Sequence, residues 1–144
     1  MMSDDVISIV AALICDPDGR VLLVRKRGTS AFMQPGGKRD VGENDVAALA
    51  RELTEVLGCH VSENNARSLG VFECVAANEP GFRVRAAVYA VDIEGAIAPK
   101  AEIDEVVWVD PRALPDLHFA PLTRDHVLPL ARRMSSLSEK PGND

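Results

Sequence analysis

The sequence predicts an α/β fold in which a mixed β-sheet packs against helices. Three observations support this fold class. The length of 144 residues suits one hydrophobic core. Apolar β-branched runs are separated by amphipathic helical segments, and their order along the chain is strands, helix, strands, helix. We therefore expect one domain over residues 1–144, with a core from about 5 to 135 and a flexible polar tail over 138–144.

The first part of the chain predicts two strands and a long loop. Residues 6–15 (VISIVAALIC) form a β-branched apolar run, which is typical of a buried strand. A turn follows at Asp16–Gly19, and residues 20–25 are the expected returning strand of a hairpin. Residues 26–43 are polar and contain several glycines, which predicts a long loop that is either functional or disordered.

Residues 44–57 predict the clearest helix of the chain. Apolar residues recur there every three to four positions, as on one side of an amphipathic helix. Asn44 is the expected N-cap, and Gly58 is the expected residue at which the helix ends. The apolar stripe consists of Val46, Leu49, Ala50, Leu53 and Leu57.

The second part of the chain predicts another hairpin, a short strand and a closing helix. Residues 68–76 and 82–93 are the hairpin strands, joined by a turn at residues 78–81. Residues 105–109 form the short strand. Residues 122–137 are amphipathic, but Pro129 within them predicts either a kink or a late helix start.

Charge and cysteine content limit the classes of partner. The net charge of −6 argues against a nucleic-acid duplex, because binding to its phosphates needs a basic surface. A small phosphorylated ligand remains compatible when a metal and a few cations meet its charge. The three cysteines show no metal-ligand spacing, which favours reduced thiols. The acidic start of the chain and the lack of a long apolar run predict a cytoplasmic protein without membrane contact.

Glu52 and Glu55 are the carboxylates with the most suggestive spacing. They are three residues apart on the predicted helix, so they lie on the same side, one turn apart, with Arg51 beside them. Oxygen ligands of this kind suit Mg²⁺ or Mn²⁺, which bind one or two carboxylates together with waters and phosphate oxygens. The Gly37 carbonyl can approach the same point, because glycine permits close backbone approach.

The segment Gly37–Cys59 resembles the signature of the Nudix hydrolase (MutT-like) family. That signature is Gly, five residues, Glu, seven residues, then Arg-Glu-aliphatic-any-Glu-Glu-any-Gly-aliphatic. Gly37 and Glu43 match its first two fixed positions, and the preceding Pro35-Gly36 is also similar to the family. Arg51, Glu52, Leu53, Glu55 and Gly58 match the later positions, and Cys59 stands at the last one. The resemblance implies a Nudix-type α/β/α sandwich with a mixed β-sheet.

The same resemblance implies an enzyme, a Mg²⁺-dependent nucleotide pyrophosphohydrolase, with Mn²⁺ as an alternative ion. It would cleave the pyrophosphate of a nucleoside diphosphate linked to another moiety. A canonical or oxidised (d)NTP is favoured over ADP-ribose or another nucleotide sugar. A homodimer is a further expectation from the family, because the sequence itself contains no signal for an oligomeric state.

Val56 departs from the family pattern. The family has there the second Glu of its Glu-Glu pair, which is usually a metal ligand together with the Glu at position 52 of this chain. Valine cannot take over that role, since it has no oxygen to offer a metal. The alternative function is therefore a nucleotide-binding or regulatory module with weakened catalysis.

Site roles follow from the matched positions. The expected catalytic group is Glu52, Glu55, Glu102 and Arg51, with metal bound by Gly37, Glu52 and Glu55. Glu102 comes from the segment that often supplies a further ligand or base in the family, and Glu105 is the second choice there. Glu43 is the expected structural brace for Arg51.

Substrate phosphates are expected to meet basic residues that flank the glycine-rich loop. Arg25, Arg27 and Lys38 are the candidates, and Arg25 and Arg27 share one side of an extended segment. Arginine suits phosphate because its guanidinium can form two parallel hydrogen bonds. The alternative for each is a solvent-facing charge.

Overall fold

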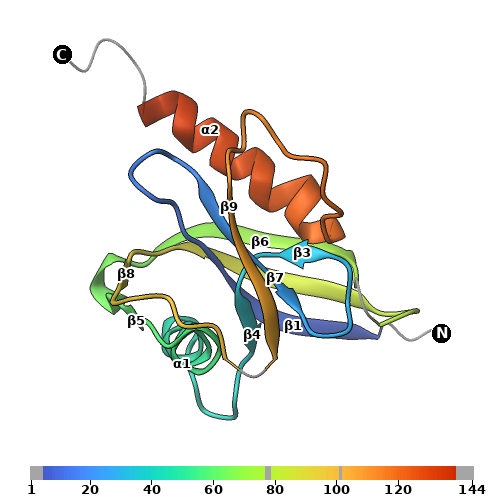
Figure 1. Ribbon diagram of the computed structural model, residues 1–144. Helices are drawn as coiled ribbons and strands as arrows, with labels where there is room; N and C mark the ends of the chain where they lie inside the picture. The colour runs from blue at the N-terminus through green and yellow to red at the C-terminus, as the bar shows by residue number, and fades with distance from the viewer. Residues whose placement is uncertain (1–4, 77–78, 101, 139–144) are drawn as a thin grey trace.

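The computed structural model describes residues 5–76, 79–100 and 102–138 (Figure 1). Its strands, in chain order, are β1 (Val6–Leu13), β2 (Val21–Lys26), β3 (Phe32–Met33), β4 (Gly36–Lys38), β5 (His60–Val61), β6 (Arg67–Val75), β7 (Arg83–Ala90), β8 (Ile93–Glu94) and β9 (Ile103–Val109). The helices are α1 (Asp45–Leu57), a 3₁₀ turn η1 (Glu63–Asn65), a π-helical turn η2 (Thr123–Val127) and α2 (Leu128–Ser138).

The strands form a mixed four-stranded sheet and two smaller antiparallel sheets. The larger sheet has the order β4-β1-β7-β6, in which β1 and β7 are parallel and the other pairs antiparallel. The smaller sheets are β3-β2-β9 and β5-β8. Helices α1 and α2 lie on opposite sides of these sheets (Figure 1). The prediction of an α/β fold with a mixed sheet between helices is confirmed.

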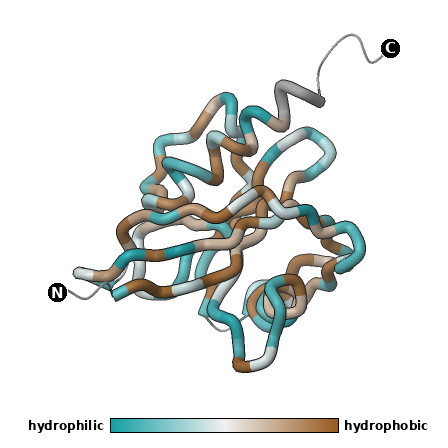
Figure 2. The backbone as a smooth tube through the Cα atoms, turned by 180° about the vertical axis from the view of Figure 1, so that it is seen from behind, coloured by the Kyte–Doolittle hydropathy of each residue, from teal (hydrophilic) through white to brown (hydrophobic). Residues whose placement is uncertain are grey.

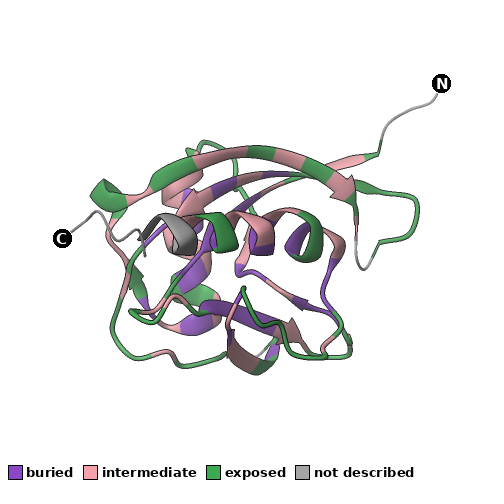
Figure 3. Cartoon of the chain, turned by 90° about the horizontal axis from the view of Figure 1, so that it is seen from above, coloured by how far each residue is buried: buried purple, intermediate pink, exposed green. Residues whose placement is uncertain are grey.

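Two hydrophobic clusters hold the layers together. In β1, Ala11 and Leu13 belong to the cluster under α2, whereas Val10 and Ala12 belong to the cluster under α1. In β2, Leu23 belongs to the cluster under α2 and Leu22 to the cluster under α1. Both strands are therefore covered on both faces, which explains their continuous apolar runs. Buried segments accordingly concentrate in the central strands and on the inner sides of the helices (Figure 3).

The predicted hairpin between the first two strands is wrong. The turn forms as expected, with Gly19 at φ 82° and its amide donating to Asp16. Only the base of a hairpin follows, where the Leu22 amide donates to Ile14 at 2.9 Å. Beyond that point β1 pairs with β4 and β7, while β2 pairs with β3 and β9. The strands separate because each has apolar residues on both faces and takes its neighbours from a different sheet.

The second predicted hairpin is confirmed as β6 and β7. Their register places Glu73 opposite Arg85, and the Phe82 amide donates to the Glu79 carbonyl in the turn. Asn78 of the expected turn lies outside the described residues. The expected strand 105–109 begins two residues earlier, at Ile103, because β9 follows β2 through an irregularity opposite Arg25 and Lys26.

Helix α1 begins and ends as the sequence predicts. The Asn44 side chain accepts a hydrogen bond of 2.8 Å from the Ala47 amide, which satisfies one free donor of the first turn. Gly58 takes the left-handed conformation at φ 69°, and its amide donates to the Thr54 carbonyl. The start and end of α1 are thus fixed by local residues.

The closing helix combines a π-helical turn with an α-helix. Pro129 is the second residue of α2, which continues directly from η2, so its missing N–H interrupts a continuous helix. The wider turn η2 immediately before it absorbs the interruption, as π-turns within helices do. Of the predicted tail, residues 139–144 lie outside the described part of the chain.

Among the described residues, none of the helices is both long and apolar enough to cross a bilayer. In Figure 2, hydrophobic segments recur along the strands and alternate with hydrophilic segments along α2.

Candidate active site

A cavity of about 340 Å³ opens where β1 and β4 meet α1 and the segment before β9. One part of its wall is apolar, and it is formed by Ile7, Ile9, Met33 and Val84. The charged residues that line the cavity are Lys26, Lys38, Glu52, Glu79 and Glu102. The cavity therefore combines a surface that suits a flat organic group with groups that suit phosphate and metal.

Glu52 is held directly against the glycine-rich segment. A Cβ atom on Gly37 would lie 2.5 and 2.7 Å from the two carboxylate oxygens of Glu52, closer than real Cβ contacts. Only glycine leaves room for the carboxylate at this position. The structure therefore brings the first and a later position of the predicted site together, strand β4 beside helix α1.

The surroundings of Glu52 disfavour its charged form. Burial raises the pKa of the Glu52 carboxyl above its ordinary value, and the negative charges of Glu55 and Glu102 act in the same direction. Arg51 opposes them through a hydrogen bond of 3.1 Å. A cation bound near Glu52 would relieve this repulsion among carboxylates.

Arg51 connects the loop to the helix. It donates to both carboxylate oxygens of Glu43, at 2.7 and 2.9 Å, and to the Lys38 carbonyl at 3.0 Å. This two-bonded ion pair lowers the pKa of Glu43 to about 2. The geometry is that of the brace expected from the sequence, because it ties residues 38–43 to the middle of α1.

Of the neighbouring residues Glu55 and Val56 on α1, only Val56 lines the cavity. The Glu55 side chain is 58% exposed and accepts a hydrogen bond of 3.2 Å from Arg51, and Glu55 does not line the cavity. Val56, one turn after Glu52, does line it. The position that carries a carboxylate in the family pattern therefore faces the cavity here with an apolar side chain. The metal-binding role of Glu55 stays a prediction.

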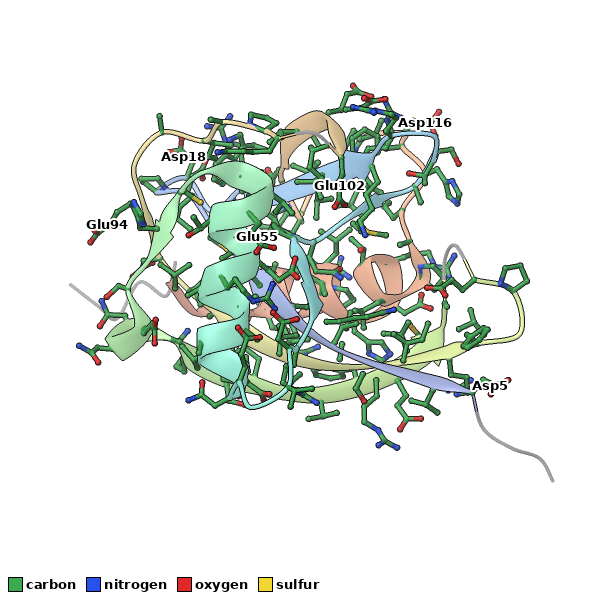
Figure 4. All side chains as sticks on the ribbon, turned by 90° about the horizontal axis from the view of Figure 1, so that it is seen from below. Asp5, Asp18, Glu55, Glu94, Glu102 and Asp116 are labelled. Carbon is green, nitrogen blue, oxygen red and sulfur yellow. The ribbon has the colours of Figure 1, made fainter. Side chains whose placement is uncertain are left out.

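Glu102 reaches the cavity because its segment is tied to the end of α1. The Ala98 and Lys100 amides donate to the Leu57 and Val56 carbonyls at 2.7 and 2.9 Å, and the Arg27 amide donates to the Glu102 carbonyl at 2.8 Å. These bonds also satisfy carbonyls that a helix end leaves free. Figure 4 shows Glu55 on α1 and Glu102 in the segment leading into β9.

The other acidic residues of that segment are engaged elsewhere. Glu105, the second choice from the sequence, accepts a hydrogen bond of 2.8 Å from Arg25, and Asp104 lies 3.9 Å from both Arg25 and Arg27. Neither carboxylate lines the cavity. Of these candidates, the structure brings Glu102 alone to the cavity within the part of the chain that it describes.

The basic residues divide between two sides of β2. Lys26 lies on the same side as Leu22 and Val24, the side that packs against α1, and it lines the cavity together with Lys38. Arg25 lies on the other side, where Glu105 and the Thr29 carbonyl accept from it. The sequence did not single out Lys26, because strand periodicity alone does not tell which side of a strand faces a site.

Gln34 is a cavity residue that sequence reasoning missed. It is 6% exposed and follows β3, next to the glycines of β4. The hydroxyl of the fully buried Thr123 in η2 donates to its Oε1 atom at 2.7 Å. A polar residue before a Pro-Gly-Gly turn was the only local signal, and its partner is 89 positions away in the sequence.

Metal ligands are only partly assembled in this arrangement. Within the described residues, no group of three or more His, Cys, Asp or Glu side chains is placed to hold a metal ion. Glu52 and Glu102 nevertheless share the cavity, and Gly37 leaves its backbone open beside them. This donor set fits Mg²⁺ bound in the usual way, by one or two carboxylates with water and substrate phosphate completing its shell.

Comparison with protein families gives one match that spans most of the chain. The model described as the NUDIX domain matches residues 7–131. No curated protein sequence matches the chain.

Solved structures share the fold at low sequence identity. A MutT NUDIX hydrolase from Burkholderia pseudomallei superposes with a TM-score of 0.71 at 24% identity, over 90% of this chain and 98% of that one. The Escherichia coli dihydroneopterin triphosphate pyrophosphohydrolase gives 0.68 at 17% identity, over 88% and 95%. A UDP-X diphosphatase gives 0.68 at 19% identity, over 93% and 66%.

Proposed function

The chain belongs to the Nudix hydrolase family, and from this premise we propose that it is a pyrophosphohydrolase of nucleotides. The substrate would be a nucleoside diphosphate linked to another moiety. A (d)NTP or modified nucleotide is favoured over ADP-ribose or a nucleotide sugar. The proteins with similar folds are named for different substrates, so the fold alone carries no preference among them.

The composition of the cavity wall is the observation that supports this proposal best. Three carboxylates, of Glu52, Glu79 and Glu102, share the wall with Lys26 and Lys38, and an apolar surface adjoins them. A nucleotide has the matching division into an anionic phosphate chain and a flat base. Lysine can hold phosphate oxygens as a point charge, while carboxylates favour a divalent cation between themselves and the phosphate.

Glu52 and the Gly37 backbone would hold the metal in this proposal, with Glu55 as the further ligand predicted from the sequence. Mg²⁺ or Mn²⁺, when bound, would neutralise charge that develops on the departing phosphate. Arg51 and Glu43 keep α1 and the loop in register, so that Glu52 stays against Gly37. Glu102, from the segment before β9, would assist in this proposal as a further metal ligand or as the base that accepts a proton from the attacking water.

A second candidate is a nucleotide-binding module with weakened catalysis. Val56 lines the cavity beside Glu52, where a carboxylate would otherwise complete the metal site. The lack of a three-ligand group among the described residues favours the same alternative. Both candidates use the same cavity and differ in turnover alone.

Hydrolysis assays with a panel of nucleotides distinguish the two candidates. The panel contains canonical and oxidised NTPs and dNTPs, ADP-ribose and a nucleotide sugar, each with Mg²⁺ and with Mn²⁺. We expect metal-dependent release of a monophosphate product, and loss of that turnover in Glu52→Gln. Glu94→Gln, an exposed glutamate of β8, is the matched control. Tight nucleotide binding without turnover would instead establish the module.

Location and assembly are part of the proposal. The three cysteines are free thiols, which supports a reducing compartment such as the cytoplasm. The net charge of −6 argues against a nucleic-acid duplex as partner and is compatible with a small phosphorylated ligand whose charge a metal and a few cations meet. A homodimer is the expected assembly and can be checked by the molar mass in solution.

A further inference from the structure

We propose that Gln34 selects nucleotides whose base carries an exocyclic oxygen, such as uracil or hypoxanthine, over those with an exocyclic amine. This inference rests on the proposed function, since it takes the cavity as the place where the nucleotide binds. It adds the chemical class of base to that function.

The Gln34 amide is nearly buried and fixed in orientation. It is 6% exposed, and its Oε1 atom accepts the hydrogen bond of 2.7 Å from the Thr123 hydroxyl. Thr123 is fully buried within η2, so this hydroxyl is itself held in place. With Oε1 engaged, the group that remains on the amide is the Nε2 donor.

The Nε2 atom of Gln34 is not engaged by the residues that the structure describes. Within the described part of the chain, Nε2 forms no hydrogen bond. In that same part, every fully buried side-chain nitrogen or oxygen has a hydrogen-bond partner, so Nε2 is not fully buried. Nε2 therefore has accessible surface, and the space that Gln34 lines is this cavity. A nearly buried donor at the wall of a cavity is suited to an acceptor on a ligand, because an unmatched polar group there costs binding free energy.

Gln34 lies on the side of the cavity that suits a base. Ile9 and Val84 of the apolar wall pack against the hydrophobic cluster under α2. Leu122 and Val127, on either side of Thr123, belong to that same cluster. Thr123 thus anchors Gln34 to the apolar wall, while Lys26 and Glu52 mark the part for phosphate and metal. A donor beside an apolar surface matches a carbonyl at the edge of a flat ring.

Binding of nucleoside monophosphates, measured by calorimetry without added metal, tests this inference. The pairs are IMP with AMP and UMP with CMP. IMP and UMP carry an exocyclic oxygen beside a protonated ring nitrogen, whereas AMP and CMP carry an exocyclic amine beside an unprotonated one. We expect the oxygen-bearing member of each pair to bind about tenfold more tightly, as one buried hydrogen bond provides. Both members of a pair carry the same phosphate, so the ratio of their dissociation constants does not depend on how tightly the phosphate is bound.

Variants of the two residues separate selectivity from stability. Gln34→Met keeps the length of the side chain without its donor, and both ratios should fall to near one. Gln34→Glu should reverse them, because one carboxylate oxygen accepts from Thr123 and the other faces the cavity. Thr123→Val should lower the ratios because it frees the amide to turn, whereas Thr123→Ser should restore them. Melting temperatures confirm that each variant is folded.

The outcomes for this inference and for the proposed function are distinct. Equal binding within both pairs, ratios that Gln34→Met leaves unchanged, or no binding of any monophosphate would overturn the inference. Selective binding without turnover of any nucleotide would support the inference while removing the proposed hydrolysis. Turnover of nucleotides without discrimination between the oxygen-bearing and amine-bearing bases would support the proposed hydrolysis and overturn the inference.

Discussion

Val56 is the residue that most affects the chemistry of the cavity. It lies one helical turn after Glu52, and both line the same wall. In this place a carboxylate would add a hard oxygen ligand, whereas valine adds apolar surface that packs against the cluster under α1. The difference between an active hydrolase and a binding module therefore depends on how well Glu102 makes up for this position.

The variant Val56→Glu should strengthen metal binding and turnover. We expect Mg²⁺ to raise its melting temperature more than that of the wild type, and hydrolysis to rise on the order of tenfold or more. Without metal the variant should melt lower, because two carboxylates one turn apart repel each other. Thermal melts with and without Mg²⁺ and the nucleotide assay measure both effects.

Val56→Gln is the matched control, since it adds polarity and length without charge. It should share any loss of packing but show no added response to Mg²⁺. If Val56→Glu and the wild type respond to Mg²⁺ equally, another group already completes the metal site.

The Glu43–Arg51 pair should make stability depend on pH in the acid range. The pKa of Glu43 is lowered from its ordinary value of 4.5 to about 2, first through the hydrogen bond from Arg51. Because the folded chain has the lower pKa, the stabilisation is complete above about 4.5 and is lost as the pH falls toward 2. The melting temperatures of wild type and Glu43→Gln should therefore differ above pH 4.5 and converge near pH 2.

Glu63→Gln provides the comparison, because Glu63 is an exposed residue of η1 without an ion pair among the described residues. Its melting profile should stay close to that of the wild type. A constant difference between wild type and Glu43→Gln down to pH 2 would show that the pair does not carry this dependence.

At the scale of elements, the site depends on how closely β4 approaches α1. The approach is set by Gly37, whose missing side chain leaves the space that the Glu52 carboxylate fills. The brace from Arg51 to Glu43 and to the Lys38 carbonyl holds the same two elements from the loop side. Gly37 and the bonds of Arg51 thus together set the distance between β4 and α1.

The variant Gly37→Ala should lower activity while keeping the fold. Gly37 has no positive φ, so alanine causes no backbone strain there. The atoms nearest to the added Cβ belong to the movable carboxylate end of Glu52. Displacing that carboxylate by about 1 Å should lower kcat/KM by about a hundredfold, with little change in melting temperature. Steady-state kinetics and a thermal melt measure the two quantities.

Gly42→Ala is the contrasting variant, in the loop between β4 and α1. Gly42 has φ 86° and would place its Cβ in open space. Alanine there should cost about 1 kcal/mol of stability through backbone strain and leave kcat/KM close to the wild type. Equal kinetic losses in both variants would mean that loop conformation, rather than the Gly37–Glu52 contact, controls activity.

At the scale of the whole molecule, two hydrophobic clusters share the central strands. Alternate residues of β1 and β2 enter the cluster under α1 and the cluster under α2. Any loosening on one side therefore alters the strands that support the other. We expect one cooperative unfolding transition, in keeping with the single domain predicted from the sequence.

Core truncation on each side tests this cooperativity. Leu53→Ala removes a fully buried side chain of α1, and Leu128→Ala removes one of α2 that is 2% exposed. Each should lower the free energy of unfolding by about 2–5 kcal/mol within the same urea transition, followed by circular dichroism and by Trp108 fluorescence. Two separate transitions, each sensitive to one variant, would contradict a single folding unit.

Local residues were enough to predict the elements whose boundaries depend on local bonds. Asn44 and Gly58 fix α1, and the turn at Gly19 and the hairpin of β6 and β7 follow from short-range patterns. The first hairpin was wrong because the pairing of β1 and β2 is decided by distant strands. Periodicity identifies a buried strand but does not name its neighbour.

The sequence by itself determined the family resemblance, the helix with its caps, and the spacing that puts Glu52 and Val56 on one side of α1. These follow from helical geometry within a short segment. Only the tertiary structure decided that Lys26 rather than Arg25 lines the cavity, that Glu102 rather than Glu105 reaches it, and that Thr123 orients Gln34. The reason is physical: β2 is buried on both faces, so alternation separates its two sides without telling which one faces the cavity.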